Sequence, residues 1–448
     1  MAIDQSILKN GPFIRLWLAQ AITQTAQNAI WYALLVIVEE TSHSTTQIGL
    51  TILSVILPSV IFGIPAGVYV DRWDKRTVMV VTNFARAAIV LGYIAFSSTL
   101  PLLFTVSFIF SVISQFFAPA ETAMIPVIVG RNRLMQANSF FHLTFTASQL
   151  IGLVMIGPLI VKVFGATAFF VITSALFAIS GLLVWRLPPD PTVVSREAAS
   201  RSPVRELIAQ LREVLALLAA DSVMLRALVY LTLGGTMTLV IAMLAPRFSV
   251  EVLGIAAADA VFVMAPAGVG ILVAVIYLSR SPMGTLADRQ RLITIGLVVV
   301  SVALGCIAGL PALGRLGGVL RPEGQSVYLL TNWDTLLVGG VMLFALIAGF
   351  GFAAVLVASQ TLLQERAPVG ARGRVFAVQF ALANLFSVIP LLSIGGLADL
   401  FGVGRVILGI AVGLMIAAWA TSRIRLDVEP VPSDVVDASP AESATPQH

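Results

Sequence analysis

A charged stretch between two long apolar runs carries the clearest chemistry in the sequence. Gly63 and Gly67 lie four residues apart before it, so they share one helix face and let a neighbouring backbone approach closely. Asp71 follows and can accept hydrogen bonds from the free amides at the start of another helix. The other charges of the group are Arg72, Asp74, Lys75 and Arg76. These residues predict a contact that opens and closes at a membrane surface.

Uncharged polar residues inside apolar runs form a second group. Gln20, Gln24 and Asn28 are spaced by four and therefore share one helix face. Such groups are costly against lipid, so we expect them to line a cavity or to join helices. We expect Gln24 and Asn28 to contact a ligand. The full set of cavity candidates is Gln20, Gln24, Asn28, Trp31, Tyr32, Gln115, Gln149, Thr236, Gln379 and Asn384.

Three titratable residues lie at a similar predicted depth in the first half of the chain. Arg86, Glu121 and His142 fall well inside apolar runs, and a lone guanidinium there needs a partner. One interpretation is a structural pair between Glu121 and Arg86 or Lys75. The other is that protonation of Glu121 or His142 biases two conformations, because histidine changes charge near physiological pH.

Composition places the chain in a membrane. Of its 448 residues, 58% are hydrophobic and 11% charged, whereas soluble domains average about 25% charged. Three histidines and the single Cys306 provide no metal cluster or disulfide, so we expect no metal and no cofactor. A membrane enzyme is disfavoured because no convergent nucleophile and base are apparent. The net charge of +4 does not indicate a nucleic-acid partner.

The apolar runs predict an all-α membrane protein with twelve transmembrane helices in two pseudo-symmetric six-helix bundles. About 20 residues cross the hydrocarbon layer. The predicted spans are 14–38, 48–70, 77–98, 101–128, 135–162, 165–187, 224–248, 256–280, 292–312, 334–362, 373–398 and 403–424. The bundles are predicted at 1–187 and 224–425, with a cytoplasmic linker at 188–223 and a disordered tail at 426–448.

Basic residues orient these spans. With the N-terminus in the cytoplasm, twenty-one of the 27 Lys and Arg residues fall on that side. This bias predicts that both termini are cytoplasmic. Within the linker, Ser202 and Pro203 predict the start of an amphipathic helix on the membrane surface.

The charged stretch resembles the signature between helices 2 and 3 of the major facilitator superfamily of transporters. A second copy runs from Gly284 to Arg291, with Asp288 expected to cap a loop. Within the superfamily the chain is most similar to drug and siderophore exporters, the branch of macrolide efflux proteins and the enterobactin exporter. Residues carrying this likeness include Pro65, Phe117, Pro119, Ala120, Pro126, Leu134, Ala137, Asn138, Gln364, Glu365, Arg366, Pro368, Gly373, Arg374, Val375, Gly395, Gly396 and Asp399.

The resemblance implies the major facilitator fold and a transporter of the cell membrane. Gly152, Gly157 and Pro158 look like the exporters' antiporter motif, without the glycine pair expected after the proline. Asp71 is expected to contact the start of helix 11 near Gly373. An acid common in helix 1 and an arginine common in helix 4 are absent, so proton antiport does not simply carry over.

Two classes of function remain at this point. The leading one is secondary active export of a bulky amphipathic molecule by alternating access, with protons as a candidate coupling ion. The chain is expected to act as a monomer among membrane lipids. The alternatives are a lysophospholipid flippase, whose family shares the Pro-Ala feature of helix 4, and a receptor or scaffold that transports nothing.

Overall fold

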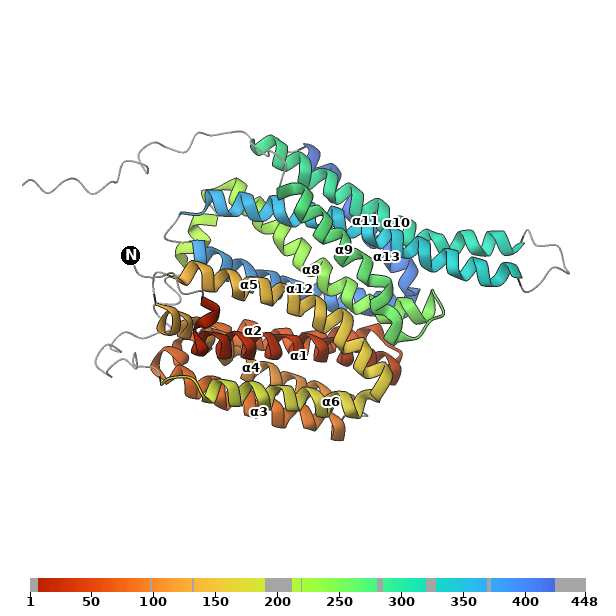
Figure 1. Ribbon diagram of the computed structural model, residues 1–448. Helices are drawn as coiled ribbons and strands as arrows, with labels where there is room; N and C mark the ends of the chain where they lie inside the picture. Colours follow the sequence, from red (N-terminus) through yellow and green to blue (C-terminus); the bar gives the residue numbers. More distant parts are fainter. Residues whose placement is uncertain are drawn as a thin grey trace, which may run out of the picture.

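Long helices lie side by side in two groups in the computed structural model (Figure 1). The structure describes residues 7–96, 99–130, 133–189, 212–218, 220–279, 285–319, 328–368 and 372–423. At some helical positions only the backbone is described, and these include Asp71, His142, 312–319, 328–336 and 372–374.

The first group contains the helices of the N-terminal half. They are α1 (Gly11–Ser42), α2 (Thr45–Arg72), α3 (Lys75–Phe96), α4 (Leu100–Val129), α5 (Leu134–Leu150), the π-helix η3 (Ile151–Ile156) and α6 (Gly157–Trp185). A short 3₁₀ turn, η1 (Ile7–Lys9), precedes them. Asn10 starts α1, because its side chain accepts a hydrogen bond from the amide of Phe13 at 3.2 Å and a proline follows at the first turn.

Gly165 breaks α6 into two helical stretches. Its φ of 78° and ψ of 169° are not helical, and the helix resumes directly after it. Glycine tolerates this backbone because it has no Cβ. The predicted boundary between the spans 135–162 and 165–187 therefore falls at a real interruption of the helix.

The second group contains the helices of the C-terminal half. They are α8 (Ser222–Glu251), α9 (Ala260–Ser279), α10 (Leu286–Val319), α11 (Tyr328–Arg366), α12 (Arg372–Phe401) and α13 (Val403–Arg423), with a 3₁₀ turn, η5 (Ala257–Asp259), before α9. Asp221 starts α8 by accepting hydrogen bonds from the amides of Val223 and Met224.

Eleven helices among the described residues are long and apolar enough to cross a membrane. The helices α10 and α11 exceed their predicted spans of 292–312 and 334–362 by the most, since they continue past the rest of the bundle as a projecting pair (Figure 1). The predicted spans ended where the apolar runs end, at glycines and charged residues. Helical hydrogen bonding does not require apolar side chains and continues beyond those points.

The outward-facing surface of the helices is apolar. Leu400 is 79% exposed and Ile389 73% exposed, and many other large apolar side chains share this orientation. Soluble proteins rarely expose apolar surface on this scale. Together with the long apolar helices, this surface identifies a multi-pass membrane protein.

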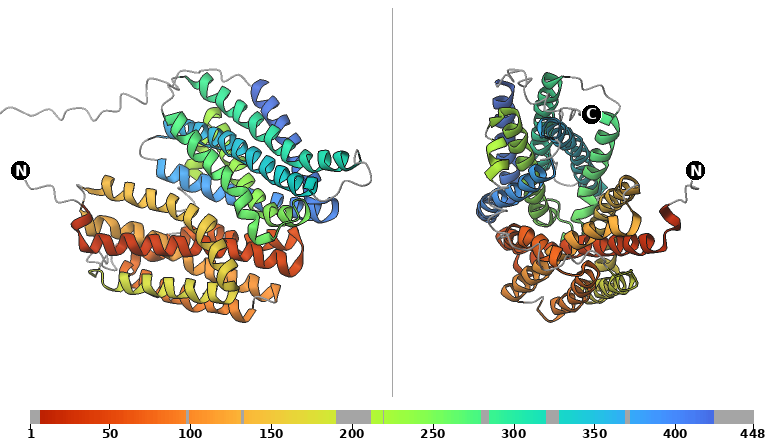
Figure 2. Two further views of the ribbon diagram at one scale, coloured as in Figure 1. Left: turned by 45° about the vertical axis from the view of Figure 1, so that its right-hand side comes forward. Right: turned by 90° about the vertical axis from the view of Figure 1, so that its left-hand side faces the viewer.

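The two halves meet mainly along α2 and α12, with α1 and α2 also packing against α8. We call the end of the bundle where α1 begins the near face, and the end where α1 gives way to α2 the far face. The second-half helices slope toward the first half as they approach the far face (Figure 2). A continuous apolar core spans this junction, including Ile48, Val240 and Leu391.

The structure describes only part of the predicted linker at 188–223. Residues 212–218 are helical, with Val214 and Leu218 buried and Arg212 exposed, which is the amphipathic pattern expected there. Leu215 is 49% exposed and lies off this buried face. Ser202 and Pro203 lie outside the described residues.

Candidate functional site

The polar face of α1 lies inside the bundle. Gln20 is buried, and Gln24 and Asn28 are partly buried. The Oε1 atom of Gln20 and the Nδ2 atom of Asn28 have no hydrogen-bond partner among the described residues. Buried polar atoms without partners are uncommon in native proteins. These two atoms are therefore unusual, and the predicted contact of this face with a ligand stays a prediction.

The π-helix η3 presses against this part of α1. A Cβ atom at Gly152 would lie 2.5 Å from the carbonyl oxygen of Thr25 and 2.9 Å from Cβ of Asn28. A Cβ at Gly157 would lie 3.0 Å from the ring of Tyr32. The glycines of the antiporter-like motif thus permit close packing beside Asn28, with Pro158 buried next to them. Single π-helical turns recur at functional sites in other proteins.

The other cavity candidates lie in different environments. Asn384 on α12 donates to the hydroxyl of Ser59 on α2 at 3.3 Å, so it joins the halves. Thr236 on α8 is buried and bonds Ser387 on α12 at 2.8 Å, within the second half. Gln115 bonds its own helix at Ser111, while Gln379 and Trp31 are partly buried and Gln149 is exposed.

Asp399, near the end of α12, holds the start of α2 at the far face. Its Oδ1 accepts from the amide of Thr45 at 2.6 Å, and its Oδ2 accepts from the amide of Thr46 at 3.0 Å. The hydroxyls of Ser44 and Thr46 also donate to Oδ2, at 2.7 and 2.6 Å. This carboxylate satisfies amides that the first turn of a helix leaves free.

Three further contacts join the halves at the far face. Glu39 on α1 is buried, and its Oε1 accepts from Arg247 on α8 at 3.2 Å. Arg247 also pairs with Glu251 on its own helix at 3.4 Å. The ammonium of Lys162 lies 2.7 Å from Asp259, and the hydroxyl of Tyr32 donates to the carbonyl of Ala258. These contacts join α1 and α6 of the first half to α8 and η5 of the second.

The near face presents the charged stretch differently. No described atom lies within 4 Å of a Cβ built on Gly67, and Gly63 meets only Oε1 of Gln115 at 3.7 Å. Arg72 is exposed, Lys75 is buried, and Arg76 donates to the carbonyl of Trp185 within the first half. The side chain of Asp71 and those near Gly373 lie outside the described part, so the predicted gate contact stays a prediction.

Arg86 is buried within the first half. Its Nη2 donates to Oδ1 of Asn83 at 2.8 Å, and its guanidinium lies 4.5 Å from the ring centroid of Phe117 and 4.9 Å from that of Phe177. Glu121 is also buried, and its Oε1 has no hydrogen-bond partner among the described residues. The side chain of His142 lies outside the described part. The structure thus packs Arg86 against Asn83 and two phenylalanine rings, and the predicted grouping with His142 stays a prediction.

Asp288 is a helix cap. Its Oδ2 accepts from the amide and hydroxyl of Thr285 at 3.2 and 2.6 Å, which fixes the start of α10. The sequence predicted that Asp288 caps a loop, whereas it lies in the first turn of α10 and caps that helix; Gly284 lies outside the described residues. Arg289 beside it pairs with Glu365 on α11.

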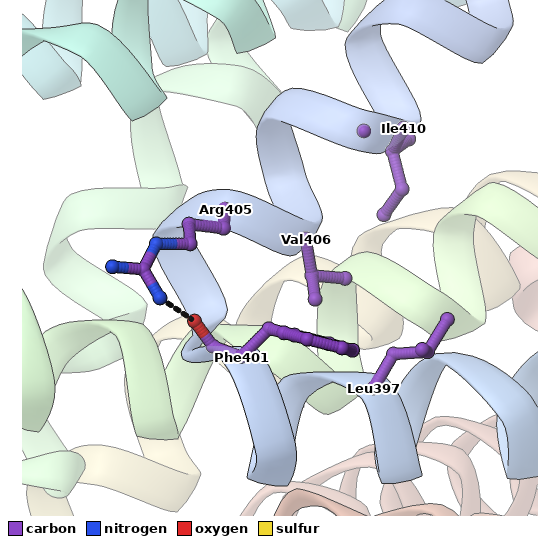
Figure 3. Close-up of a pocket in the computed structure, with 6 residues that line it drawn as sticks. Leu397, Phe401, Arg405, Val406 and Ile410 are labelled. Carbon is purple, nitrogen blue, oxygen red and sulfur yellow. Dashed lines mark hydrogen bonds between the residues drawn. The ribbon is translucent and has the colours of Figure 1, made fainter.

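An apolar hollow of about 340 Å³ lies between the end of α12 and the start of α13 (Figure 3). Leu397, Phe401, Val406 and Ile410 line it, and Arg405 bonds the carbonyl of Phe401 at 3.3 Å. Leu397 and Phe401 are exposed, so this hollow opens at the surface of the bundle, and it shares no lining residue with the polar face of α1.

Sequence reasoning missed the ion pair of Glu39 and Arg247. Glu39 follows the predicted span 14–38 directly, and Arg247 ends the span 224–248 on the same membrane side. Opposite charges at the ends of these two predicted spans were the one sign in the sequence that Glu39 and Arg247 could pair. Their pairing depends on how the two halves are rotated, which the order of spans does not specify.

Solved structures share this architecture over almost the whole chain. The nucleoside transporter NupG superposes with a TM-score of 0.66 at 16% identity, covering 92% of this chain and 100% of that one. A bacterial homologue of the human lysosomal transporter Spinster, in an inward-facing and unoccupied conformation, gives 0.66 at 14% identity, covering 93% and 96%. At these identities the likeness defines the fold, which is that of helical multi-pass membrane transporters.

The chain matches the family model of the Major Facilitator Superfamily over residues 16–389, and it belongs to that superfamily. The resemblance predicted from the charged stretch is confirmed.

Relatives of this chain include named exporters. The enterobactin exporter EntS of Escherichia coli is 27% identical over 445 residues, covering 92% of this chain and 94% of EntS. The MFS-type transporter YkuC of Bacillus subtilis is 28% identical over 190 residues, 41% of this chain and 44% of YkuC. Macrolide efflux protein A of Streptococcus pyogenes is 29% identical over 132 residues, 29% of this chain and 33% of that protein. The chain thus spans under half the length of YkuC in their alignment.

Proposed function

We propose that this protein is a secondary active exporter of bulky amphipathic small molecules and that it works by alternating access. Similarity to EntS over 92% of the chain supports export, as does the partial likeness to macrolide efflux protein A. The polar face of α1 supports the substrate class. It combines two buried amide atoms that have no partner among the described residues with aromatic side chains at Trp31 and Tyr32.

The observation that carries alternating access is the difference between the two faces. At the far face, Asp399, Glu39 and Lys162 each bind across the junction. At the near face, the glycine pair that should receive another backbone has no described backbone atom near it. Rocking of two rigid halves predicts this asymmetry, because closing one end opens the other.

The orientation belongs to the same proposal. The excess of basic residues favours a cytoplasmic near face and cytoplasmic termini. If α5, η3 and residues 157–164 together form one membrane crossing that ends at the Gly165 break, the number of crossings becomes twelve. The conformation described here then opens toward the cytoplasm, where an exporter loads its substrate, and the protein resides in the bacterial inner membrane.

The test is transport by the purified protein in liposomes. A panel of macrolides, catecholate siderophores and lysophospholipids should show movement of one class, dependent on an imposed proton gradient. The Gln24→Ala variant should change the apparent affinity or the order of preference within that class. Compounds to which cells become sensitive on loss of the protein would supply the panel. Binding without movement of any compound would instead favour a receptor.

A further inference from the structure

The helices α2 and α12 come from different halves, run antiparallel and pack along one another. The start of α2 therefore lies beside the end of α12 at the far face. Each helix also carries an acid close to its last residue. Asp71 is the penultimate residue of α2, and Asp399 lies two residues before the end of α12.

At the far face this arrangement is closed. Four hydrogen bonds from Ser44, Thr45 and Thr46 converge on the carboxylate of Asp399. The free amides of a helix start carry a partial positive charge, so a carboxylate binds there more strongly than a neutral group does.

Glycines allow the two backbones to meet at this end. A Cβ on Gly395 would lie 3.1 Å from the Cα of Thr46, and one on Gly49 would lie 3.1 Å from the carbonyl oxygen of Leu391. At the other end of α2, Gly67 has no described atom within 4 Å of such a position. Among the described residues, α2 thus packs closely against α12 at the far face, whereas no described atom approaches the Cβ position of Gly67 at the near face.

We propose that Asp399 is a latch holding the far face shut, and that it alternates with Asp71 at the opposite ends of the same two helices. Opening the far face must pull the first turn of α2 away from Asp399. The same rotation would bring the first turn of α12 toward Gly67 and Asp71. This inference rests on the proposed alternating access, and Asp71 enters it through its place at the end of α2.

The test measures conformation directly, without any substrate. In a Cys306→Ser background, a Leu391→Cys reporter sits fully buried in the joint between α2 and α12. A water-soluble maleimide should label it slowly in the purified protein. Asp399→Asn keeps the side-chain shape and removes the charge, so we expect labelling to be roughly fivefold faster. Arg405→Gln at the same face, whose hydrogen bond to the carbonyl of Phe401 stays within the second half, is the matched control and should leave the rate unchanged.

Two further variants complete the design. Thr46→Val removes one hydroxyl donor and should speed labelling by about twofold to threefold, which keeps the test possible if Asp399→Asn folds poorly. Adding Asp71→Asn to Asp399→Asn should return the rate toward the wild-type value, because each end then loses its latch.

Unchanged labelling in folded Asp399→Asn and Thr46→Val variants would overturn the latch. Faster labelling that Asp71→Asn fails to reverse would overturn the alternation. If the protein transports no compound but Asp399→Asn still labels faster than wild type, the transport proposal is wrong and the latch stands.

Discussion

Glu39 and Arg247 form an ion pair between the two halves, with 3.2 Å between Oε1 and Nη1. The carboxylate is 1% exposed and the arginine side chain keeps a quarter of its surface accessible. The remaining oxygen of Glu39 has no partner among the described residues. Arg247 therefore offsets the free-energy cost of burying the charge of Glu39.

Replacing only Arg247 should be costly. Arg247→Ala leaves a buried, unpaired carboxylate, and we expect a loss of roughly 3 kcal/mol in unfolding free energy. Glu39→Gln should cost less, because a neutral amide needs no counter-charge. Thermal unfolding in detergent measures both, with Glu40→Gln as the control on the exposed neighbouring residue. Equal stability of Arg247→Ala and wild type would show that this pair contributes nothing to the junction.

Gly152 should tolerate no side chain. In Gly152→Ala the new Cβ would lie 2.5 Å from the carbonyl oxygen of Thr25, so α1 and η3 must separate. Overpacking of this kind costs about 1–3 kcal/mol. Gly413→Ala in α13 is the matched control, since its position has no atom within 4 Å. Thermal unfolding should separate the two variants, and equal melting temperatures would exclude close packing at Gly152.

Much of the fold follows from the sequence because lipid imposes simple rules on it. Apolar runs of membrane length located the helices, and Gly165 marked the division between two spans. The projecting parts of α10 and α11 escaped the same rule, since they are helical without being wholly apolar. The charged stretch predicted the family, because its glycines and charges have a fixed order.

The contacts across the junction were harder to predict. Asp399 was noted only as the close of a motif, and the sequence does not reveal that Ser44 and Thr46 lie beside it. The same holds for Thr236, a cavity candidate from its depth, whose hydroxyl is bonded to Ser387. Depth along a helix follows from the sequence, whereas rotation and the partner across an interface depend on tertiary packing.

Gln24 and Asp288 should respond oppositely to mutation. Gln24 is partly buried on the helix face that also carries Gln20 and Asn28, so Gln24→Ala should shift apparent substrate affinity with normal protein yield. Asp288 caps α10 through Thr285, so Asp288→Asn should weaken the helix start by about 1 kcal/mol and lower yield without changing affinity. Transport kinetics and purified yield distinguish these effects. The reverse pattern would remove Gln24 from the substrate site.

Energy coupling through Glu121 can be tested by mutation. Arg86 is fully enclosed by Asn83, Phe117 and Phe177, and Glu121 is buried with one oxygen lacking a described partner. If protonation of Glu121 releases this network, Glu121→Gln should mimic the protonated form. Export driven by a proton gradient should then be lost, while substrate binding stays measurable.

A purely structural role for the same residues gives a different result. Glu121→Gln would then lower thermal stability, because Arg86 loses a nearby negative charge, yet the protein that folds would still couple export to protons. His142→Ala, combined with Glu121→Gln, removes both titratable candidates of this half. Gradient-dependent export that persists in the double variant would eliminate the coupling role and leave Arg86 and Glu121 as a buried structural pair. Loss of export with binding intact would instead assign proton coupling to this network, in place of the acid that helix 1 lacks.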